Sequence, residues 1–262
     1  MEQQLNNKRA LVTGAASGMG RAIAFAFARE GATVAVHARN LGSSTELVNE
    51  IEQSGGRAVA VAADLTDTEA VKVLCAQTIV LLGGIDIVVN NAGAVSKADL
   101  AGTSEEEWDR MMQVNLKTPF LISQCLVPEM KLNPDGGRLI FNSSVGAKLP
   151  DPMGSAYNAS KAGLLGFVRC LAVELGVNGI TVNAICPGWI DTPMAEKLHE
   201  EMYSNDANDN FDAFYDASIR GNMLNARITP DNIAEFAVYL ASDKGKFMTA
   251  QAFNICAGIC LS

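Results

Sequence analysis

"LVTGAASGMG", residues 11–20, is the stretch that decides the fold. An apolar run leads into three glycines, Gly14, Gly18 and Gly20, and then into an alanine-rich helical pattern. Glycine lets the backbone turn tightly and approach a ligand without a clashing Cβ, and a helix N-terminus offers free N–H groups to a phosphate. The stretch predicts a dinucleotide-binding turn. Because its spacing is GxxxGxG, a purely structural turn remains the alternative.

Outward from this turn, strand and helix patterns alternate. Runs such as "IDIVV" at 85–89 lack the two-residue alternation of a half-exposed strand, so the strands should be buried on both faces. Strands are expected at 9–12, 33–37, 58–62, 85–90, 138–142, 181–185 and 251–255. Helices are expected at 18–30, 44–54, 68–82, 104–115, 116–131, 155–176 and 230–242. We predict an α/β fold: a single doubly wound Rossmann-type domain over residues 1–262, with a seven-stranded parallel sheet and helices on both faces.

Composition narrows the function classes. Of the 262 residues, 48% are hydrophobic, which suffices for one substantial core. The net charge of −9 disfavours nucleic acid and anionic membranes as partners. The polar N-terminus does not resemble a signal peptide, and no apolar run approaches the ~18 residues of a membrane span. We therefore expect a cytoplasmic protein.

The cysteine pattern indicates free thiols. Six cysteines are scattered along the chain without a CxxC pair, and there are only two histidines. We expect no metal site, and buried cysteines in a reducing compartment.

One connection is unusually long. Residues 195–225 carry seven acidic and two basic residues, with the aromatics Tyr203, Phe211, Phe214 and Tyr215 among them. Long connections in compact domains are usually functional lids or disordered. The aromatic content favours a lid, and we expect a substrate lid over residues 192–228.

A second signal is "NSSVGAKLPDPMGSAYNASKAG", residues 142–163. Tyr157 and Lys161 lie four residues apart, so they share one helix face. An ammonium beside a phenol favours the phenolate and lowers the tyrosine pKa. Ser144 follows the fifth expected strand, at the edge where open α/β sheets bind ligands, and Ser143 is its alternative. A tyrosine–lysine pair by itself also occurs on solvated helices.

The motifs taken together resemble the short-chain dehydrogenase/reductase family. They are TGxxxGxG at 13–20, NNAG at 90–93, Asn115, SS at 143–144, YNASK at 157–161 and CPGWIDTPM at 186–194. Their order and spacing match the family from Lys8 to Gly258. The resemblance implies hydride transfer between a nicotinamide cofactor and a carbonyl or secondary alcohol.

Residue roles follow from this resemblance. Tyr157 would be the proton donor in reduction, Ser144 would orient the carbonyl, and Lys161 would bind the nicotinamide ribose and depress the tyrosine pKa. Asn115 would hold a water that links Lys161 to solvent. The implied cofactor-binding residues are Gly14, Ser17, Gly18, Met19, Gly20, Arg39, Asp64, Leu65, Asn91, Ala92, Gly93, Tyr157, Lys161, Pro187, Gly188, Ile190 and Thr192.

"VAVHARN", residues 34–40, bears on the cofactor. In the family an acid at the end of the second strand marks NAD(H) preference, whereas Ala38–Arg39 resembles the NADP(H)-preferring members. An arginine can clamp a 2′-phosphate through charge-assisted bonds, with His37 and Asn40 as further donors. Ser17 stands where many NADP(H) enzymes carry a second basic residue, so NAD(H) is the alternative.

We expect reduction of a small-molecule ketone with NADP(H). Reduction of 3-oxoacyl groups on acidic acyl carrier protein is less favoured, because Asp135, Asn178 and the acidic lid would oppose docking. A 3-oxoacyl thioester reductase, an NAD-dependent alcohol dehydrogenase and a non-catalytic NADP(H)-binding protein are the alternatives.

Three further expectations concern the pocket, the tail and assembly. Met153, Trp189 and Met194 are candidate pocket residues. "NICAG" at 254–258 departs from the family's NVDGG, with Cys256 in place of the acid. The resemblance also implies a homo-oligomer, a tetramer or dimer, built on 116–131 and 155–176.

Overall fold

A single parallel sheet organises the molecule. The computed structural model describes residues 3–203, 211–212, 216 and 220–261. The sheet has seven strands in the order β3-β2-β1-β4-β5-β6-β7, and every neighbouring pair is parallel. The strands are β1 (Arg9–Val12), β2 (Thr33–Ala38), β3 (Arg57–Ala62), β4 (Ile87–Asn90), β5 (Gly137–Asn142), β6 (Ile180–Pro187) and β7 (Ala252–Ile255). The Rossmann-type sheet predicted from the sequence is confirmed.

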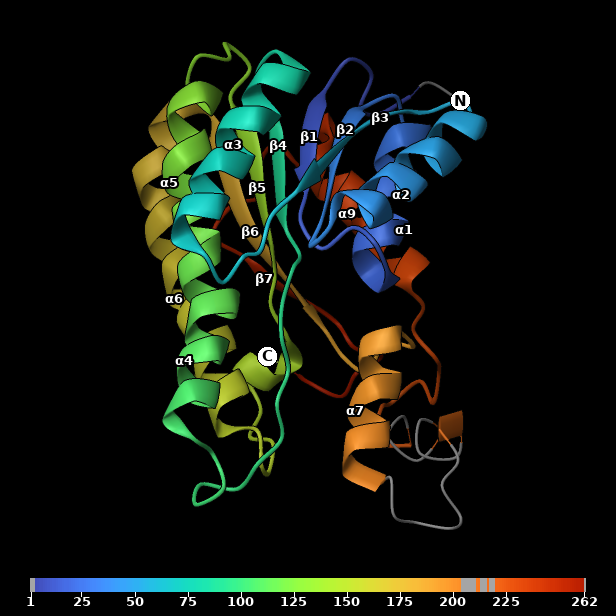
Figure 1. Cartoon of the computed structure of the whole chain (residues 1–262), viewed down its shortest axis with the longest axis vertical. Helices are drawn as coiled ribbons and strands as arrows, with labels where there is room; N and C mark the ends of the chain where they lie inside the picture. Colours follow the sequence, from blue (N-terminus) through green and yellow to red (C-terminus); the bar gives the residue numbers. More distant parts are fainter. Residues whose placement is uncertain (1–2, 204–210, 213–215, 217–219, 262) are drawn as a thin grey trace.

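Helices cover both faces of this sheet (Figure 1). One layer holds α1 (Gly18–Arg29), α2 (Leu41–Gln53) and α9 (Pro230–Ala241). The opposite layer holds α3 (Thr68–Leu82), α4 (Glu105–Met112), α5 (Thr118–Met130) and α6 (Ser155–Leu175). A further helix, α7 (Pro193–Tyr203), lies beyond the carboxyl edge of the strands (Figure 1). The strand order reverses between β1 and β4, and open α/β sheets bind ligands at that point.

The central strands are buried on both faces, as their unbroken apolar runs predict. In β4 all four residues are buried. Val89 packs into the core between the sheet and α1 and α9, whereas Val88 packs into the core beneath α3, α5 and α6. The alternation of side chains along the strand therefore connects two separate apolar layers.

Helix α2 begins three residues before the predicted start at Ser44. Asn40 is its N-cap, and the Asn40 side chain accepts a bond from the Ser43 N–H at 2.9 Å. Ser44 is buried, and its hydroxyl donates to the carbonyl of Val61 at 2.8 Å. Ser44 therefore ties α2 to the sheet.

Two other segments differ from the predicted elements. A π-helical turn, Gln113–Lys117, joins α4 to α5 where the sequence predicted two ordinary helices. Helix α7 occupies the start of the expected lid, where no helix was predicted. Of the lid aromatics, Phe211 is described, whereas Phe214, Tyr215 and the side chain of Tyr203 lie outside the described residues.

The expectation that the cysteines are buried holds for four of the six. Cys75, Cys186, Cys256 and Cys260 are buried free thiols, but Cys170 is exposed on the outward side of α6, and Cys125 is intermediate. Within the described residues, no helix is long and apolar enough to cross a membrane, and no three potential ligand side chains gather into a metal site.

Asp86 joins the amino ends of β1 and β4. Its carboxylate accepts two bonds from the Arg9 guanidinium, at 2.8 and 2.9 Å, and one from the Arg9 backbone N–H at 2.8 Å. We predict that Asp86→Ala lowers the free energy of unfolding by about 2–4 kcal/mol, because it removes the carboxylate that accepts three bonds from the partly buried Arg9. Urea unfolding measures the loss. Lys72→Met, which breaks an exposed pair with Glu69, is the control and should leave the midpoint unchanged; equal effects of the two variants would contradict the prediction.

Candidate active site

Asn91, just after β4, connects three strands at the carboxyl edge of the sheet. Its Nδ2 donates to the carbonyls of Thr13 at 2.9 Å and Gly14 at 3.2 Å. Its Oδ1 accepts from Asn142 Nδ2 at 2.9 Å, at the end of β5. The Thr13 hydroxyl accepts the N–H groups of Asn91 and Ala92, each at 3.0 Å. The predicted residue Asn91 therefore uses both its side chain and its backbone N–H to fix the glycine turn.

The glycine turn needs glycine at all three predicted positions. Gly14 and Gly18 have φ of +62° and +53°, in the left-handed region that other residues rarely adopt. A Cβ on Gly14 would lie 2.9 Å from Ala92 Cα, and one on Gly20 would overlap the Gly14 carbonyl. A Cβ on Gly18 would lie 3.2 Å from Thr192 Cγ2. The turn, Ala92 and Thr192, all predicted cofactor residues, are thus brought together.

The start of α1 fits a pyrophosphate. Ser17 is the N-cap, yet within the described residues its hydroxyl accepts no bond from the first turn, and that turn carries no acid. The N–H groups around Gly18, Met19 and Gly20 are therefore available to an anion, with the positive end of the helix dipole behind them.

Arg39 and Asp64 lie at the ends of neighbouring strands. Arg39 is exposed just after β2, and Asp64 is exposed shortly after β3. Hydrogen bonds from Thr66 lower the pKa of Asp64, and the charge of Arg39 lowers it further. Arg39 is therefore near enough to act electrostatically on Asp64 while its guanidinium stays open to solvent.

His37 is not available as a phosphate donor, contrary to the sequence-based suggestion. Its Nδ1 accepts the Gly14 N–H at 3.1 Å, so its Nε2 carries the proton and faces the Ala63 carbonyl at 3.1 Å. Burial lowers the pKa of His37, which keeps the ring neutral. His37 supports the glycine turn from beneath.

The other predicted cofactor residues contact neighbouring parts of the chain. Leu65 is buried, and its carbonyl accepts the Thr118 hydroxyl at 2.7 Å. Pro187 ends β6, and the Gly188 N–H donates to the Ile255 carbonyl at 3.0 Å. Ile190 is buried in the α1–α9 core, so its side chain packs internally.

The two serines after β5 have different partners. The Ser143 hydroxyl is buried and donates to the Lys161 carbonyl at 3.1 Å, which ties β5 to α6. The Ser144 hydroxyl accepts the Gly146 N–H at 3.0 Å and hydrogen-bonds the Tyr157 hydroxyl. Ser144, not Ser143, is thus the serine that shares a site with Tyr157.

Lys161 lies beneath the tyrosine. It is only 4% exposed, and its Nζ donates to the Asn142 carbonyl at 2.8 Å. Nζ lies 5.9 Å from the centroid of the Tyr157 ring. A Cβ on Gly93 would lie 3.4 Å from this Nζ and 3.2 Å from Asn115 Oδ1, so Gly93 leaves the space between them open.

The pKa shifts in the site correct one expectation. Burial raises the pKa of Tyr157, and the hydrogen bond with Ser144 opposes that rise. Burial also lowers the pKa of Lys161 to about 8. The expected lowering of the tyrosine pKa by Lys161 does not appear, because desolvation dominates and the ammonium is directed to the Asn142 carbonyl.

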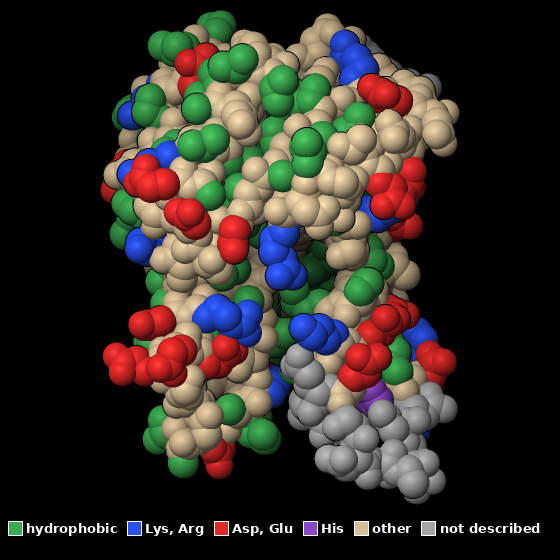
Figure 2. All heavy atoms as spheres, in the orientation of Figure 1, with side chains coloured by type: hydrophobic (Ala, Val, Ile, Leu, Met, Phe, Trp, Pro, Cys, Tyr) green, Lys and Arg blue, Asp and Glu red, His purple; other side chains and the backbone are tan. Residues whose placement is uncertain are grey.

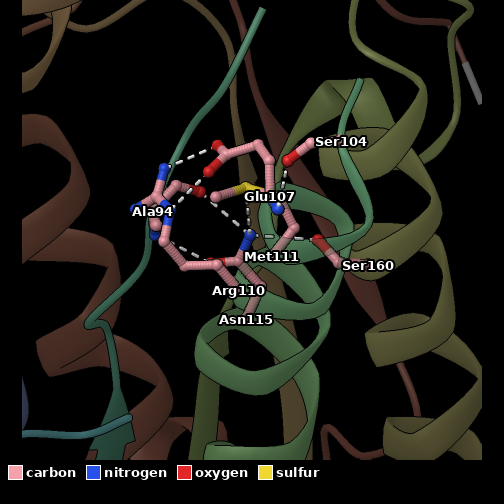
Figure 3. Close-up of polar contacts among 7 residues, drawn as sticks. All are labelled: Ala94, Ser104, Glu107, Arg110, Met111, Asn115 and Ser160. Atoms are coloured by element: carbon pink, nitrogen blue, oxygen red, sulfur yellow. Dashed lines mark hydrogen bonds and ion pairs between the residues drawn. The ribbon is translucent and has the colours of Figure 1, made fainter. Parts of the chain in front are cut away.

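Asn115 lies in the π-helical turn and is 1% exposed. Figure 3 shows its amide between Ala94, Met111 and Ser160. It accepts from the Ala94 N–H at 2.8 Å and donates to the Ala94 carbonyl at 2.9 Å and to Ser160 Oγ at 3.0 Å. Ser160 in turn donates to the Tyr157 carbonyl at 2.7 Å. Asn115 is thus connected to α6 through Ser160, a link that the sequence did not indicate.

The surrounding surface is hollowed and bordered by cations. Figure 2 shows a hollow in the middle of one face, with hydrophobic side chains within it and Lys and Arg side chains around it. The candidate pocket residues Met153 and Met194 are 49% and 46% exposed, and Trp189 is intermediate. Such a site can hold an anionic cofactor beside a partly apolar substrate.

Known proteins match this chain over nearly its whole length. The family model described as enoyl-(acyl carrier protein) reductase matches residues 14–260. The 3-oxoacyl-(acyl-carrier-protein) reductase FabG of Thermotoga maritima is 35% identical over 256 residues, covering 98% of this chain and 99% of that protein. The short-chain dehydrogenase/reductase eriH of Hericium erinaceus is 36% identical over 253 residues, covering 95% and 96%.

A solved structure agrees with these relatives. A variant of actinorhodin polyketide ketoreductase, determined with NADPH, has a TM-score of 0.90 and 32% identity, with 99% of each chain covered. Together with the motifs and the geometry around Tyr157, these matches show that the chain belongs to the short-chain dehydrogenase/reductase family of oxidoreductases.

Proposed function

We propose that this enzyme reduces the carbonyl group of a small molecule to a secondary alcohol with NADPH. The observation that carries the proposal is the convergence of Ser144, Tyr157 and Lys161 beside the glycine turn. Asn91 and Asn142 connect the two halves, because one bonds the turn and the other bonds Lys161.

The cofactor is NADP(H). The glycine turn and the start of α1 would hold the pyrophosphate, and Arg39 would provide the cation for the 2′-phosphate. The ketoreductase with 32% identity was determined with NADPH, which supports this assignment. When bound, the reduced cofactor supplies the hydride.

The catalytic residues divide the remaining chemistry. Ser144 donates a hydrogen bond to the substrate carbonyl and orients it, while Tyr157 transfers its hydroxyl proton to the developing alkoxide. Lys161 would hold the nicotinamide ribose, with its ammonium beneath the Tyr157 ring. Asn115 fixes Ala94 and Ser160 on either side of this arrangement and would hold the water that returns a proton to Lys161.

The substrate class follows from the surface around the hollow. The proposal includes the substrate lid expected over residues 192–228, and α7 is a described helix within that range. Asp135 and Asn178 offer no basic side chain to an acidic acyl carrier protein, and the lid is acidic. We therefore favour a free, partly apolar ketone. The 35% identity to a 3-oxoacyl reductase makes a 3-oxoacyl thioester the second candidate.

We further propose that the chain forms a cytoplasmic homo-oligomer through α5 and α6. Apolar side chains are exposed along these helices and just beyond: Phe120 at 41%, Val173 at 80% and Val177 at 90%. The six free cysteines are consistent with a reducing compartment.

A substrate panel tests the proposed function. Ketones, 3-oxoacyl thioesters and reducing sugars are assayed with NADPH and NADH side by side, and free and carrier-bound thioesters are compared. We expect the highest kcat/KM for a free ketone with NADPH. A carrier-bound thioester reduced faster than every ketone would establish the second candidate instead.

Tyr157→Phe should lower kcat at least about a hundredfold, because the substrate oxygen loses its proton donor. NADPH binding, measured by fluorescence titration, should be retained, since the hydroxyl acts in the chemical step. Near-normal turnover by this variant would eliminate the proposed mechanism.

Arg39→Ala should raise the KM for NADPH at least about tenfold, which corresponds to ~1.4 kcal/mol, through loss of the 2′-phosphate contact. The KM for NADH should stay nearly unchanged. Steady-state kinetics with both cofactors measures the difference. A proportional change for both cofactors would contradict the phosphate role.

The pKa of about 8 for Lys161 gives a pH prediction. Lys161 is cationic below this pKa and neutral above it, so kcat/KM for NADPH should decline as pH rises through about 8. In Lys161→Arg the guanidinium stays charged, so the decline should disappear even if the rate is lower. A decline unchanged in this variant would assign the transition to another group.

A further inference from the structure

Successive residues of the segment after β4 contact two different parts of the fold: the helical region around α4, and the loop before α6. We call residues 94–98 the strap. On one side the Ala94 backbone bonds Asn115, and the Ser96 hydroxyl bonds the Glu107 carboxylate of α4. On the other side Lys97 forms an ion pair with Asp151, and the Ala98 N–H donates to the Met153 carbonyl at 2.8 Å.

The loop on this second side leads directly into the catalytic helix. The Asp151 carbonyl accepts the Gly154 N–H at 3.0 Å, and the Gly154 carbonyl accepts the Asn158 N–H at 2.8 Å. Gly154 is the N-cap of α6, three residues before Tyr157. Met153 has a φ of +62°, so the loop is held in a backbone conformation that it would not favour alone. The ties to the strap maintain that conformation.

The ion pair joins a buried cation to a partly exposed carboxylate. The Lys97 side chain is only 8% exposed, whereas that of Asp151 is 39% exposed. An aspartate held this close to a buried cation loses much of its effect on other groups. The charge of Asp151 acts on Tyr157, where it raises the pKa of the hydroxyl in addition to burial.

The other groups that face Tyr157 come from α6, from β6 and from the turn after β5. Lys161 lies beneath the ring on α6, and Ser144 bonds the hydroxyl. Cys186 of β6 also acts on it, but burial raises the pKa of that thiol, so it is neutral near pH 7. Within the described residues, Asp151 is therefore the anion that acts on the catalytic hydroxyl, and Lys97 is its partner.

We propose that Lys97 and Asp151 form a positioning pair for the catalytic tyrosine: the pair fixes the loop that starts α6 against the strap and shields Tyr157 from the Asp151 carboxylate. This role rests on the proposed function of Tyr157 as proton donor. Neither residue touches the reacting atoms, so both act through Tyr157.

The test is a titration of Tyr157 in Lys97→Met, Asp151→Asn and the double variant. Tyrosinate absorbance is recorded against pH, and the curve of the matching Tyr157→Phe protein is subtracted. Lys97→Met leaves the carboxylate unshielded and should raise the tyrosine pKa by about half a unit or more. Asp151→Asn removes the anion and should lower it by a similar amount. The double variant should fall between the two.

Kinetics of the same variants separates positioning from binding. Each single variant should lower kcat about tenfold with little change in the KM for NADPH, and Lys97→Arg should restore most of the loss. Lys72→Met is the matched control, because it removes an exposed lysine from an ion pair on α3. Circular dichroism confirms that each variant is folded.

The outcomes are distinguishable. A tyrosine pKa that is unmoved, or that moves in the same direction in both single variants, would overturn the positioning role. Because the titration needs no substrate, it decides this question even if the wild-type enzyme reduces no ketone, a result that would count against the proposed function alone.

Discussion

The site depends on a series of hydrogen bonds that runs from Thr13 through the Asn91 side chain to Asn142. The Asn91 side chain donates hydrogen bonds to carbonyls at the start of the glycine turn and accepts one from the Asn142 side chain. The backbone carbonyl of Asn142 in turn accepts a hydrogen bond from the Lys161 ammonium. The strand order reverses between β1 and β4, so a crevice opens at this point. One connected network thus sets the distance between the glycine turn and Lys161.

Burial then sets the chemistry of the groups around this network. Lys161 is nearly inaccessible and has a pKa of about 8, while Tyr157 keeps its proton because burial opposes the phenolate. A protonated tyrosine suits the reduction direction, in which the hydroxyl must give up a proton only as charge develops on the substrate oxygen. The His37 ring, neutral and bonded at both nitrogens, keeps the glycine turn in place without adding a charge.

Much of this was predictable from local sequence. The β-branched runs that lack alternation indicated a sheet buried on both faces, and the glycine and Tyr–Lys spacings indicated which edge carries the site. Local patterns could not show that Asn115 lies in a π-helical turn, because a single extra residue in a helix leaves no periodic signal. Local patterns also assigned His37 to the cofactor, which was wrong. The contacts of His37 with Gly14 and Ala63 involve residues distant in the chain, so the local sequence could not show them. The sequence preferred Ser144 over Ser143, and the structure supports that choice, because Ser143 bonds the Lys161 carbonyl whereas Ser144 bonds the Tyr157 hydroxyl.

The central claim is that the site transfers hydride from NADPH to a carbonyl carbon under the control of Tyr157. The most direct measurement uses NADPH deuterated at the transferring position, a ketone from the panel that turns over, and mass spectrometry of the alcohol. The account predicts one deuterium at the carbinol carbon of each product molecule, and loss of this product in Tyr157→Phe. Alcohol without deuterium, or labelled alcohol formed at the same rate by the variant, would contradict it.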